Sequence, residues 1–325
     1  MTDRFSNPSR LRKTIRDVLV VVMASGTTVA MSFSCGGELD PDRGPCKASP
    51  PAVVPTCTAY DVPVTGDLTR CGFTDSGGAT SATCSSLCGG NVVGCGLLTD
   101  ASVIHCSNGC AVDGRRPEGL AELGRPMDVA SAFASLAYFE AASVDAFAIL
   151  RTELVHHGAP LALLRAISRA QSDEVRHAAM ARKAARALGA SLVEPKVPKH
   201  DLRSLEQIAL ENAREGCVRE TFGALLGEWQ STHAPVVWIR DHYAILARDE
   251  SRHAALSWRL HTWLMSQLSP SARARVVAEL RRAVADLVDS LEDPSPRLAA
   301  LGLPSASTAR SMALALFGPR VALAA

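Results

Sequence analysis

The sequence predicts an all-α fold for most of the chain, built around four long helices. Two observations carry this prediction: segments rich in Ala and Leu contain the same five-residue pattern twice, and Gly and Pro residues separate the segments. Nine of the ten cysteines, by contrast, precede residue 111, so the two parts of the chain follow different rules. The expected organisation is a signal peptide (1–34), a small disulfide-rich irregular module (35–112), a linker (113–126), a four-helix bundle (127–266) and a C-terminal helical extension (267–325).

Four helices are expected at residues 127–157, 160–188, 201–232 and 235–265. Gly158-Ala159-Pro160 stops the first helix and Gly189 stops the second. Residues 190–200 contain two prolines and form the connection to the next pair of helices.

The extension is expected to open with Ser269 as an N-cap and Pro270 at the first helical position. Its first helix reaches about residue 291, and a short apolar helix follows near residues 311–317. The surface of this extension is one place at which a homodimer could form.

The repeated pattern Asp-Glu-x-Arg-His occurs at residues 173–177 and again at 249–253. Residues three apart on a helix share a face, so each copy points one carboxylate and one imidazole in the same direction. Such a pair can bind one metal ion, and two copies of the pattern therefore predict two bound ions.

One glutamate lies a similar distance upstream of each copy, Glu140 before the first and Glu215 before the second. Each is followed five residues later by another acid, Asp145 or Glu220, and then by a Phe. Helical spacing places Glu140 and Glu215 on apolar stripes and Glu220 off the stripe, which makes Glu220 the weaker ligand candidate. A buried carboxylate is costly unless it is paired, protonated or bound to metal, so converging acids need cations.

One Glu from each of two helices and one Glu-x-x-His from each of the other two form a ligand set that resembles the ferritin-like di-iron carboxylate superfamily. Its members include bacterioferritins, rubrerythrins and bacterial multicomponent monooxygenases. The Asp-Glu-x-Arg-His pattern is most similar to that of the last group. The resemblance covers residues 126–265. It implies a ferritin-like bundle with six metal ligands, namely Glu140, Glu174, His177, Glu215, Glu250 and His253. The alternative is a set of amphipathic helices whose Glu and His residues face inward by chance.

Glu174 and Glu250 are expected to bridge two iron ions, with manganese as the alternative, because oxygen ligands with nitrogen suit these metals. Asp173 and Asp249 are expected to accept the remaining imidazole N–H of a ligand histidine. Ordinary surface pairing of these aspartates with the neighbouring arginines is the competing interpretation.

Two further residues lie on the same stripes. Glu211, one turn before Glu215, is an extra ligand, an acid at an ion entry or a partly exposed helix-end acid. Tyr243 is a hydrogen-bond donor or oxidisable residue near the metals, or a packing aromatic. Cys217 is expected to be a small core residue.

The resemblance implies an oxidoreductase that reacts with O2 or peroxide and takes electrons from a donor that the sequence does not identify. A manganese catalase-like enzyme is one alternative, and a surface-anchored binding or scaffold protein with a structural metal site is another. Nucleic acid is not an expected partner, because the net charge is only +1 and aromatic residues are few.

The N-terminus favours export. Basic residues precede an apolar run at 18–33 that is short and interrupted for a membrane span. Cys35 resembles the lipidated cysteine of a bacterial lipoprotein, which predicts a cell-envelope lipoprotein or a secreted protein that meets the membrane only through a lipid anchor or this segment. Cleavage with release, or retention as an uncleaved anchor, are the alternatives.

The cysteine-rich module has few large apolar residues and therefore needs covalent bridges. The disulfide candidates are Cys46, Cys57, Cys71, Cys84, Cys88, Cys95, Cys106 and Cys110. Their connectivity stays open. A zinc site formed by Cys84, Cys88, Cys106 and Cys110, with His105 nearby, is the competing interpretation.

Overall fold

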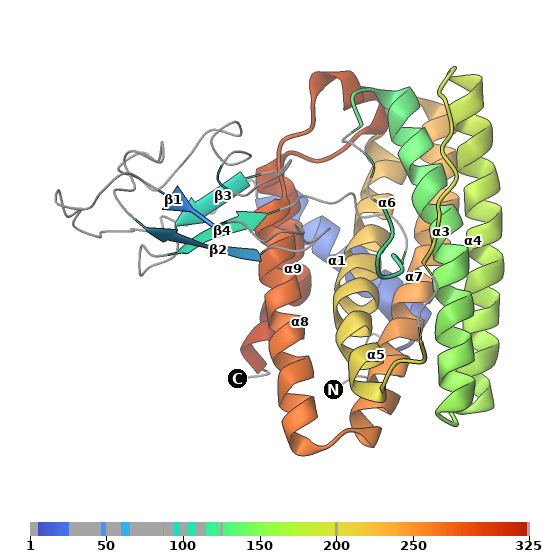
Figure 1. Ribbon diagram of the computed structural model, residues 1–325. Coiled ribbons are helices and arrows are strands. Elements are labelled where there is room, and N and C mark those ends of the chain that lie inside the picture. Colours follow the sequence, from blue (N-terminus) through green and yellow to red (C-terminus); the bar gives the residue numbers. More distant parts are fainter. Residues whose placement is uncertain are drawn as a thin grey trace. The chain divides into compact units, whose positions relative to one another are not determined.

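A computed structural model of the chain falls into two compact units, which are described separately (Figure 1). The residues that it describes are 6–25, 47–49, 60–65, 87, 94–97, 103–107, 115–121, 123, 126–198 and 201–323. The first unit, called the helical unit below, contains Met1–Thr28, Val112–Leu287 and Glu292–Ala325. The second unit contains Val29–Ala111 and Val288–Leu291.

The helical unit is built from long helices, as the sequence predicts. Its central elements are α3 (Val129–His156), α4 (Leu161–Ala187), α5 (Leu205–Glu211), η3 (Asn212–Glu220), α6 (Thr221–His233) and α7 (Val237–Gln267). Helix α3 packs along α4, and α6 packs along α7, while α4 and η3 also contact α7. The expected helices agree with the observed ones within about four residues, a usual margin at helix ends.

The ends of these helices follow from local sequence. Asp128 and Ser131 form a capping box at the start of α3, and Ser204 and Gln207 form another at the start of α5. Gly158 and Gly189 have φ values of 70° and 79°, and this left-handed conformation after a helix end favours glycine. The stops expected at these two glycines are therefore present.

The third expected helix differs from a regular α-helix, because its central segment η3 is a π-helix. A π-helix closes its hydrogen bonds from i to i+5, which places an extra residue in each turn. Residues after such a turn are rotated relative to the α-helical register, so stripe positions calculated at 3.6 residues per turn do not hold through this segment.

The N-terminal segment forms helix α1 (Pro8–Ser25), which packs against α6, α7 and α9 within the helical unit. Its apolar side is buried at Leu11, Ile15 and Val18. Arg16 Nε lies 2.8 Å from Glu228 Oε1 on α6. The segment expected to be removed as a signal peptide thus has a packed position in this unit.

Beyond α7, the C-terminal extension contains α8 (Pro270–Ser290), the 3-10 helix η4 (Pro296–Leu301) and α9 (Ala306–Leu323). The expected cap is present, since the Ala272 N–H donates to Ser269 Oγ at 3.3 Å. The last helix is longer than the segment at 311–317 that the sequence predicted.

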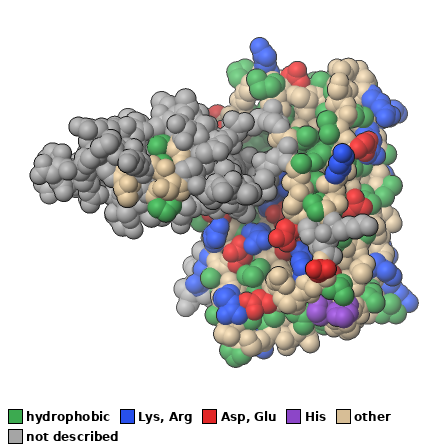
Figure 2. Space-filling view, viewed as in Figure 1, with side chains coloured by type: hydrophobic (Ala, Val, Ile, Leu, Met, Phe, Trp, Pro, Cys, Tyr) green, Lys and Arg blue, Asp and Glu red, His purple; other side chains and the backbone are tan. Residues whose placement is uncertain are grey.

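Among the described helices, α3 alone has the length and apolar composition of a membrane span. Two thirds of its most apolar window (67%) is buried inside the protein, which is typical of a core helix. On the face of the helical unit shown in Figure 2, basic and acidic side chains are intermixed and form no patch of one sign.

The second unit contains a small antiparallel sheet rather than only irregular chain. Its strands are β1 (Lys47–Ala48), β2 (Tyr60–Thr65), β3 (Gly94–Leu97) and β4 (Val103–Ser107), in the order β1-β2-β4-β3. The expectation of an irregular module is corrected to this extent. The strands are short and lie among Gly, Ser and Thr residues. No alternating apolar pattern long enough to predict a strand was therefore recognised in this segment.

Cys95 and Cys106 are register partners on β3 and β4. The other disulfide candidates and the lipidation candidate lie outside the described residues, namely Cys35, Cys46, Cys57, Cys71, Cys84, Cys88 and Cys110. Disulfide pairing, the zinc alternative and lipidation therefore stay predictions.

Residues 115–121, expected to be part of a linker, pack into the helical unit instead. Arg115 and Arg116 are buried. The Arg116 guanidinium carbon lies 3.8 Å from the centre of the Phe139 ring, and the Tyr138 hydroxyl donates to the Ala121 carbonyl at 2.7 Å. These contacts hold the segment against α3. Two of the charged residues that suggested a boundary in the sequence, Arg115 and Arg116, are in fact buried.

Candidate metal centre

The candidate site is a polar layer between two apolar clusters on α3, α4 and α7. One cluster includes Phe133, Leu136, Ala181, Ile239 and Leu246. The other includes Phe147, Leu154, Ile167, Leu256 and Leu260. Along each helix the predicted ligands fall between these clusters, so apolar packing on both sides shields the layer from water.

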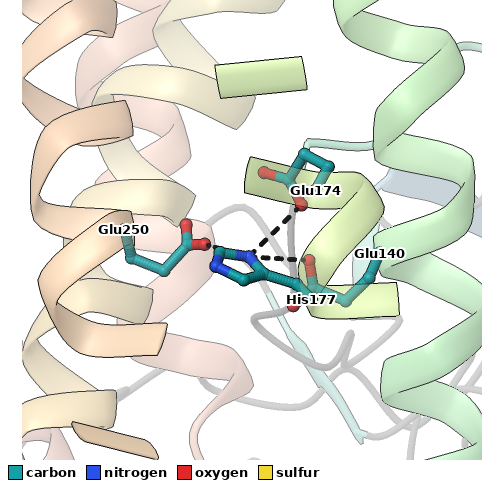
Figure 3. A group of neighbouring side chains, drawn as sticks. All are labelled: Glu140, Glu174, His177 and Glu250. Carbon is teal, nitrogen blue, oxygen red and sulfur yellow. Dashed lines mark ion pairs between the residues drawn. The ribbon is translucent and has the colours of Figure 1, made fainter. Parts of the chain in front are cut away.

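Four predicted ligands meet in this layer. Glu140, Glu174, His177 and Glu250 each offer one ligand atom, and these atoms lie within 4.8 Å of one another (Figure 3). Nδ1 of His177 lies 3.5 Å from Glu140 Oε2, 3.7 Å from Glu174 Oε2 and 3.5 Å from Glu250 Oε1. The i, i+3 spacing predicted that Glu174 and His177 would converge, and they do.

His253 joins the same group from α7. Its Nδ1 lies 3.0 Å from Glu174 Oε1 and 3.4 Å from Glu250 Oε1. Glu174 and Glu250 therefore contact both histidines and occupy the middle of the cluster, where bridging carboxylates would lie.

The buried atoms of this cluster fit a bound cation. Within this cluster, the buried atoms without a hydrogen-bond partner among the described residues are Glu140 Oε2, both Glu174 carboxylate oxygens, Glu250 Oε1 and the Nδ1 atoms of His177 and His253. Buried polar atoms are normally paired, and leaving one unpaired costs about 1–3 kcal/mol. Carboxylate oxygens with imidazole nitrogens are the ligands that iron and manganese prefer.

Two aspartates orient the histidines, and they do so across helices. His177 Nε2 on α4 lies 3.2 Å from Asp249 Oδ2 on α7, whereas His253 Nε2 on α7 lies 3.4 Å from Asp173 Oδ2 on α4. A carboxylate can only accept a hydrogen bond, so each contact places a proton on Nε2. Nδ1 then faces the acids and is the nitrogen that could bind an ion. The expected Asp–His contacts are present, with each motif serving the other motif's histidine.

Arginines of the two motifs cross in the same way. Arg176 Nη2 contacts Asp249 as well as its own neighbour Asp173, the latter at 2.9 Å. Arg252 Nη2 lies 2.8 Å from Asp173 Oδ2 and 2.8 Å from Asp249 Oδ1. Although burial would raise the pKa of both aspartates, their histidine and arginine partners hold each pKa far below its usual range. Simple surface pairing within one helix does not describe this network.

The metal-free cluster is expected to hold protons in place of a cation. Burial would lower the pKa of His177, but Asp249, Glu140 and Glu174 raise it to about 12. Against the same effect of burial, Glu250, Asp173 and Glu174 raise the pKa of His253 well above its usual value. Burial and the neighbouring Glu174 raise the pKa of Glu140, while the pKa of Glu174 is lowered by its neighbours despite burial.

Of the two acids on η3, Glu220 is the more deeply buried. Glu220 is buried, and Ser257 Oγ donates to its Oε2 at 2.6 Å. Burial raises its pKa to about 7, against the opposing effects of Arg115 and His253. Ser257, the donor to this carboxylate, lies one turn after His253 on α7. The charges of His253 and Glu250 act on the Glu220 pKa in opposite directions.

Glu215, the preferred ligand by helical spacing, pairs instead with Arg219 on its own helix at 3.4 Å. The spacing argument assumed a regular α-helix, and the π-helical turns change which acid faces inward. Glu215 Oε2 and Glu220 Oε1 are both buried without a hydrogen-bond partner among the described residues, and the deeper burial of the whole side chain favours Glu220.

Glu211 is buried rather than a partly exposed helix-end acid, because Arg115 Nη1 lies 3.3 Å from its Oε2. Tyr243 packs near Phe133 and His242, with ring centroids 6.5 Å and 5.7 Å away. Cys217 is buried, as expected for a core residue, and its thiol donates to the Ser257 carbonyl at 3.6 Å.

Sequence reasoning missed four buried polar residues around the site. Arg115 reaches η3 from a distant segment, and Asn212 and Ser257 bond to each other through the Ser257 carbonyl at 3.0 Å. No periodic pattern marks such contacts. His242 was detectable, since it lies eight residues before Glu250 on the same face; burial, and then the charge of His177, lower its pKa to about 4.

Comparison of the chain with models of protein families, with curated proteins and with solved structures finds no match. What the protein does is therefore argued from the chemistry of the site itself.

Proposed function

We propose that the helical unit is a ferritin-like four-helix bundle that holds two metal ions. Its helices are α3, α4, the continuous α5–η3–α6 segment and α7. The observation that carries the proposal is the set of six buried ligand atoms without hydrogen-bond partners, four oxygens and two imidazole nitrogens, on α3, α4 and α7. We assign the ligands as Glu140, Glu174, His177, Glu220, Glu250 and His253, with Glu215 replaced by Glu220.

Iron is the proposed metal, with manganese as the alternative, and the proposed activity is that of an oxidoreductase acting on O2 or peroxide. Bound iron supplies the electrons for reduction of such an oxidant. The protein's part is to fix the ligands: Asp173 and Asp249 hold the histidine tautomers, and the apolar clusters keep water from the layer. The electron donor is a separate partner.

The first experiment is metal analysis of protein loaded with Fe²⁺ without oxygen. We expect about two ions per chain in the wild type and marked loss in Glu174→Ala and Glu250→Ala, because each removes a carboxylate that contacts both histidines. Glu194→Ala is the matched control, since this acid is exposed and pairs only with Arg182 among its described charged contacts. Unchanged metal content in the two central variants would refute the site.

A second experiment separates an enzyme from a scaffold with a structural metal. Ferrous protein is mixed with O2 or H2O2, and oxidation is followed by absorbance. Rapid oxidation that Glu174→Ala abolishes supports the proposed activity. Protein that binds two ions yet reacts with neither oxidant would be a structural metal protein, and dismutation of H2O2 by the manganese form would support the catalase-like alternative.

Export of the chain, with a disulfide-rich module at 35–112, also belongs to the proposal. The buried side of α1 supports retention of the N-terminal segment as a packed part of the helical unit. Mass spectrometry of protein from an exporting host is expected to find α1 attached and the module's cysteines paired. A mature chain that begins at Cys35 with a lipid would establish the lipoprotein alternative instead, and free thiols throughout would refute the export argument.

A further inference from the structure

The two halves of the proposed centre are not equivalent. The first half-site consists of Glu140, Glu174 and His177, and the second consists of Glu220, Glu250 and His253. Both have the same donor types, one terminal carboxylate, one central carboxylate and one imidazole. They differ in what surrounds the terminal carboxylate.

In the first half-site the terminal carboxylate is held only by other ligands, as far as the described residues show. Glu140 Oε2 lies 3.5 Å from His177 Nδ1 and has no hydrogen-bond partner. The charges that act on Glu140 come from Glu174 and His177. Among the described residues, no fixed cation therefore competes with an ion for this carboxylate.

In the second half-site a fixed cation already accompanies the terminal carboxylate. Arg115 Nε lies 3.5 Å from Glu220 Oε1, and both side chains are about 1% exposed. The Ser257 hydroxyl occupies the other oxygen at 2.6 Å. An ion in this half-site would have to share Glu220 with the arginine.

The arginine cannot easily move away, because its surroundings hold both ends. Its backbone N–H donates to Ser143 Oγ at 3.0 Å, and Nη2 donates to Asn212 Oδ1 at 2.6 Å. The guanidinium carbon lies 5.7 Å from the centre of the Phe147 ring. A Cβ on Gly216 would lie 2.5 Å from Nη2, so only glycine leaves room for the guanidinium here.

We propose that the two half-sites bind metal with unequal affinity, the first tightly and the second weakly, because Arg115 competes with the ion for Glu220. Two like charges near one carboxylate repel each other, and the repulsion is strong where water is excluded. The inference rests on the proposed di-metal site. Its consequence is a protein that holds one ion firmly and exchanges the other.

The test is titration of the metal-free protein with Mn²⁺ alone, followed by calorimetry and by the EPR signal of free Mn²⁺, at pH 8. We expect two steps in the wild type, separated by about tenfold or more in affinity. In Arg115→Gln the second step strengthens by about tenfold and the first changes less. Arg115→Lys retains the charge and keeps the steps apart.

Arg203→Gln is the matched control, because Arg203 is also largely buried and binds Glu153 at 2.7 Å without contacting Glu220. It should leave both steps unchanged. Should Arg115→Gln fail to fold, Glu220→Gln tests the same point, since it should remove the weak step and leave the tight one.

The outcomes distinguish the two proposals. Absence of Mn²⁺ binding to the wild type would refute the metal site and the proposed function with it. Two steps of equal affinity, a second step that Arg115→Gln leaves unchanged or weakens, or loss of the tight step in Glu220→Gln would refute the inequality while the metal site stands.

Discussion

The chain contains one sequence pattern twice, and the two copies fold differently. In the first copy, α3 and α4, a regular α-helix presents Glu140 to the site and leaves Asp145, five residues later, exposed. In the second copy, the α5–η3–α6 segment and α7, the π-helix buries the later acid, Glu220, and leaves Glu215 paired with Arg219. Equal spacing in sequence thus buries the earlier acid in the first copy and the later acid in the second.

The difference shows that a helical stripe is reliable only where the helical period is known. Both Glu-x-x-His pairs lie in regular α-helix, so their i, i+3 geometry holds in α4 and α7. The upstream acids depend on the period of their helix, and one helix changes period at the site. π-helical turns are frequent at functional sites, which agrees with the position of η3.

The strongest test of this comparison is substitution of all four upstream acids. Glu140→Gln should abolish the tight ion and Glu220→Gln the weak one, whereas Asp145→Asn and Glu215→Gln should retain both. The reason is that Glu140 lies 3.5 Å from His177 Nδ1, and that Glu220 is the acid proposed as the terminal ligand of the second half-site. Equilibrium dialysis with Mn²⁺ measures this, and loss of an ion in Glu215→Gln with none in Glu220→Gln would restore the α-helical assignment.

The crossed aspartates provide the next largest effect. Asp249→Asn and Asp173→Asn should each weaken metal binding by about 10–100-fold, because a histidine loses the partner that fixes its tautomer. The change on α7 should weaken the ion bound by His177 on α4, and the reverse should hold for His253. Asp241→Asn, an exposed change on α7, is the control. Equal binding in all three variants would contradict the crossed arrangement.

The two copies also differ at the residue after the first upstream acid, which is Gly216 in the second copy and Ala141 in the first. Gly216→Ala should destabilise the metal-free protein by about 1–3 kcal/mol, because the new Cβ would lie 2.5 Å from both Arg115 Nη2 and Ser257 Oγ. Chemical denaturation measures the free energy of unfolding. Gly318→Ala, with no neighbouring atom within 4 Å, should be neutral or slightly stabilising, as helix propensity favours Ala.

The smallest expected effect is the release of protons when metal binds, which involves one histidine of each copy. The raised pKa values of His177, about 12, and of His253 keep both imidazoles protonated in the metal-free protein at pH 7. Binding through Nδ1 requires the neutral form, so uptake of two ions should release about two protons from the imidazoles, besides any that Glu140 holds, and binding should strengthen as pH rises. Calorimetry in buffers of different ionisation enthalpy measures the release. His177→Gln should release about one proton fewer, and release of none would show neutral histidines.

Several parts of the site were predictable from sequence because the interactions are local. Glu174 with His177, and Glu250 with His253, follow from helical spacing, and the stops at Gly158 and Gly189 follow from backbone preference. The Asp–His contacts were expected, but not that each one crosses between helices. Glu220 was ranked below Glu215 because the ranking assumed a regular α-helix. Arg115 was not foreseen because its contacts span about a hundred residues of chain (96 to Glu211).

By itself, the sequence determined the helical character of the chain, the convergence of each Glu-x-x-His pair and the separation of a cysteine-rich segment, since composition and periodicity act over a few turns. Only the tertiary structure decided which upstream acid turns inward, which histidine each aspartate serves, and where the buried arginine lies. These choices depend on packing between distant segments, where the cost of an unpaired buried charge selects one arrangement.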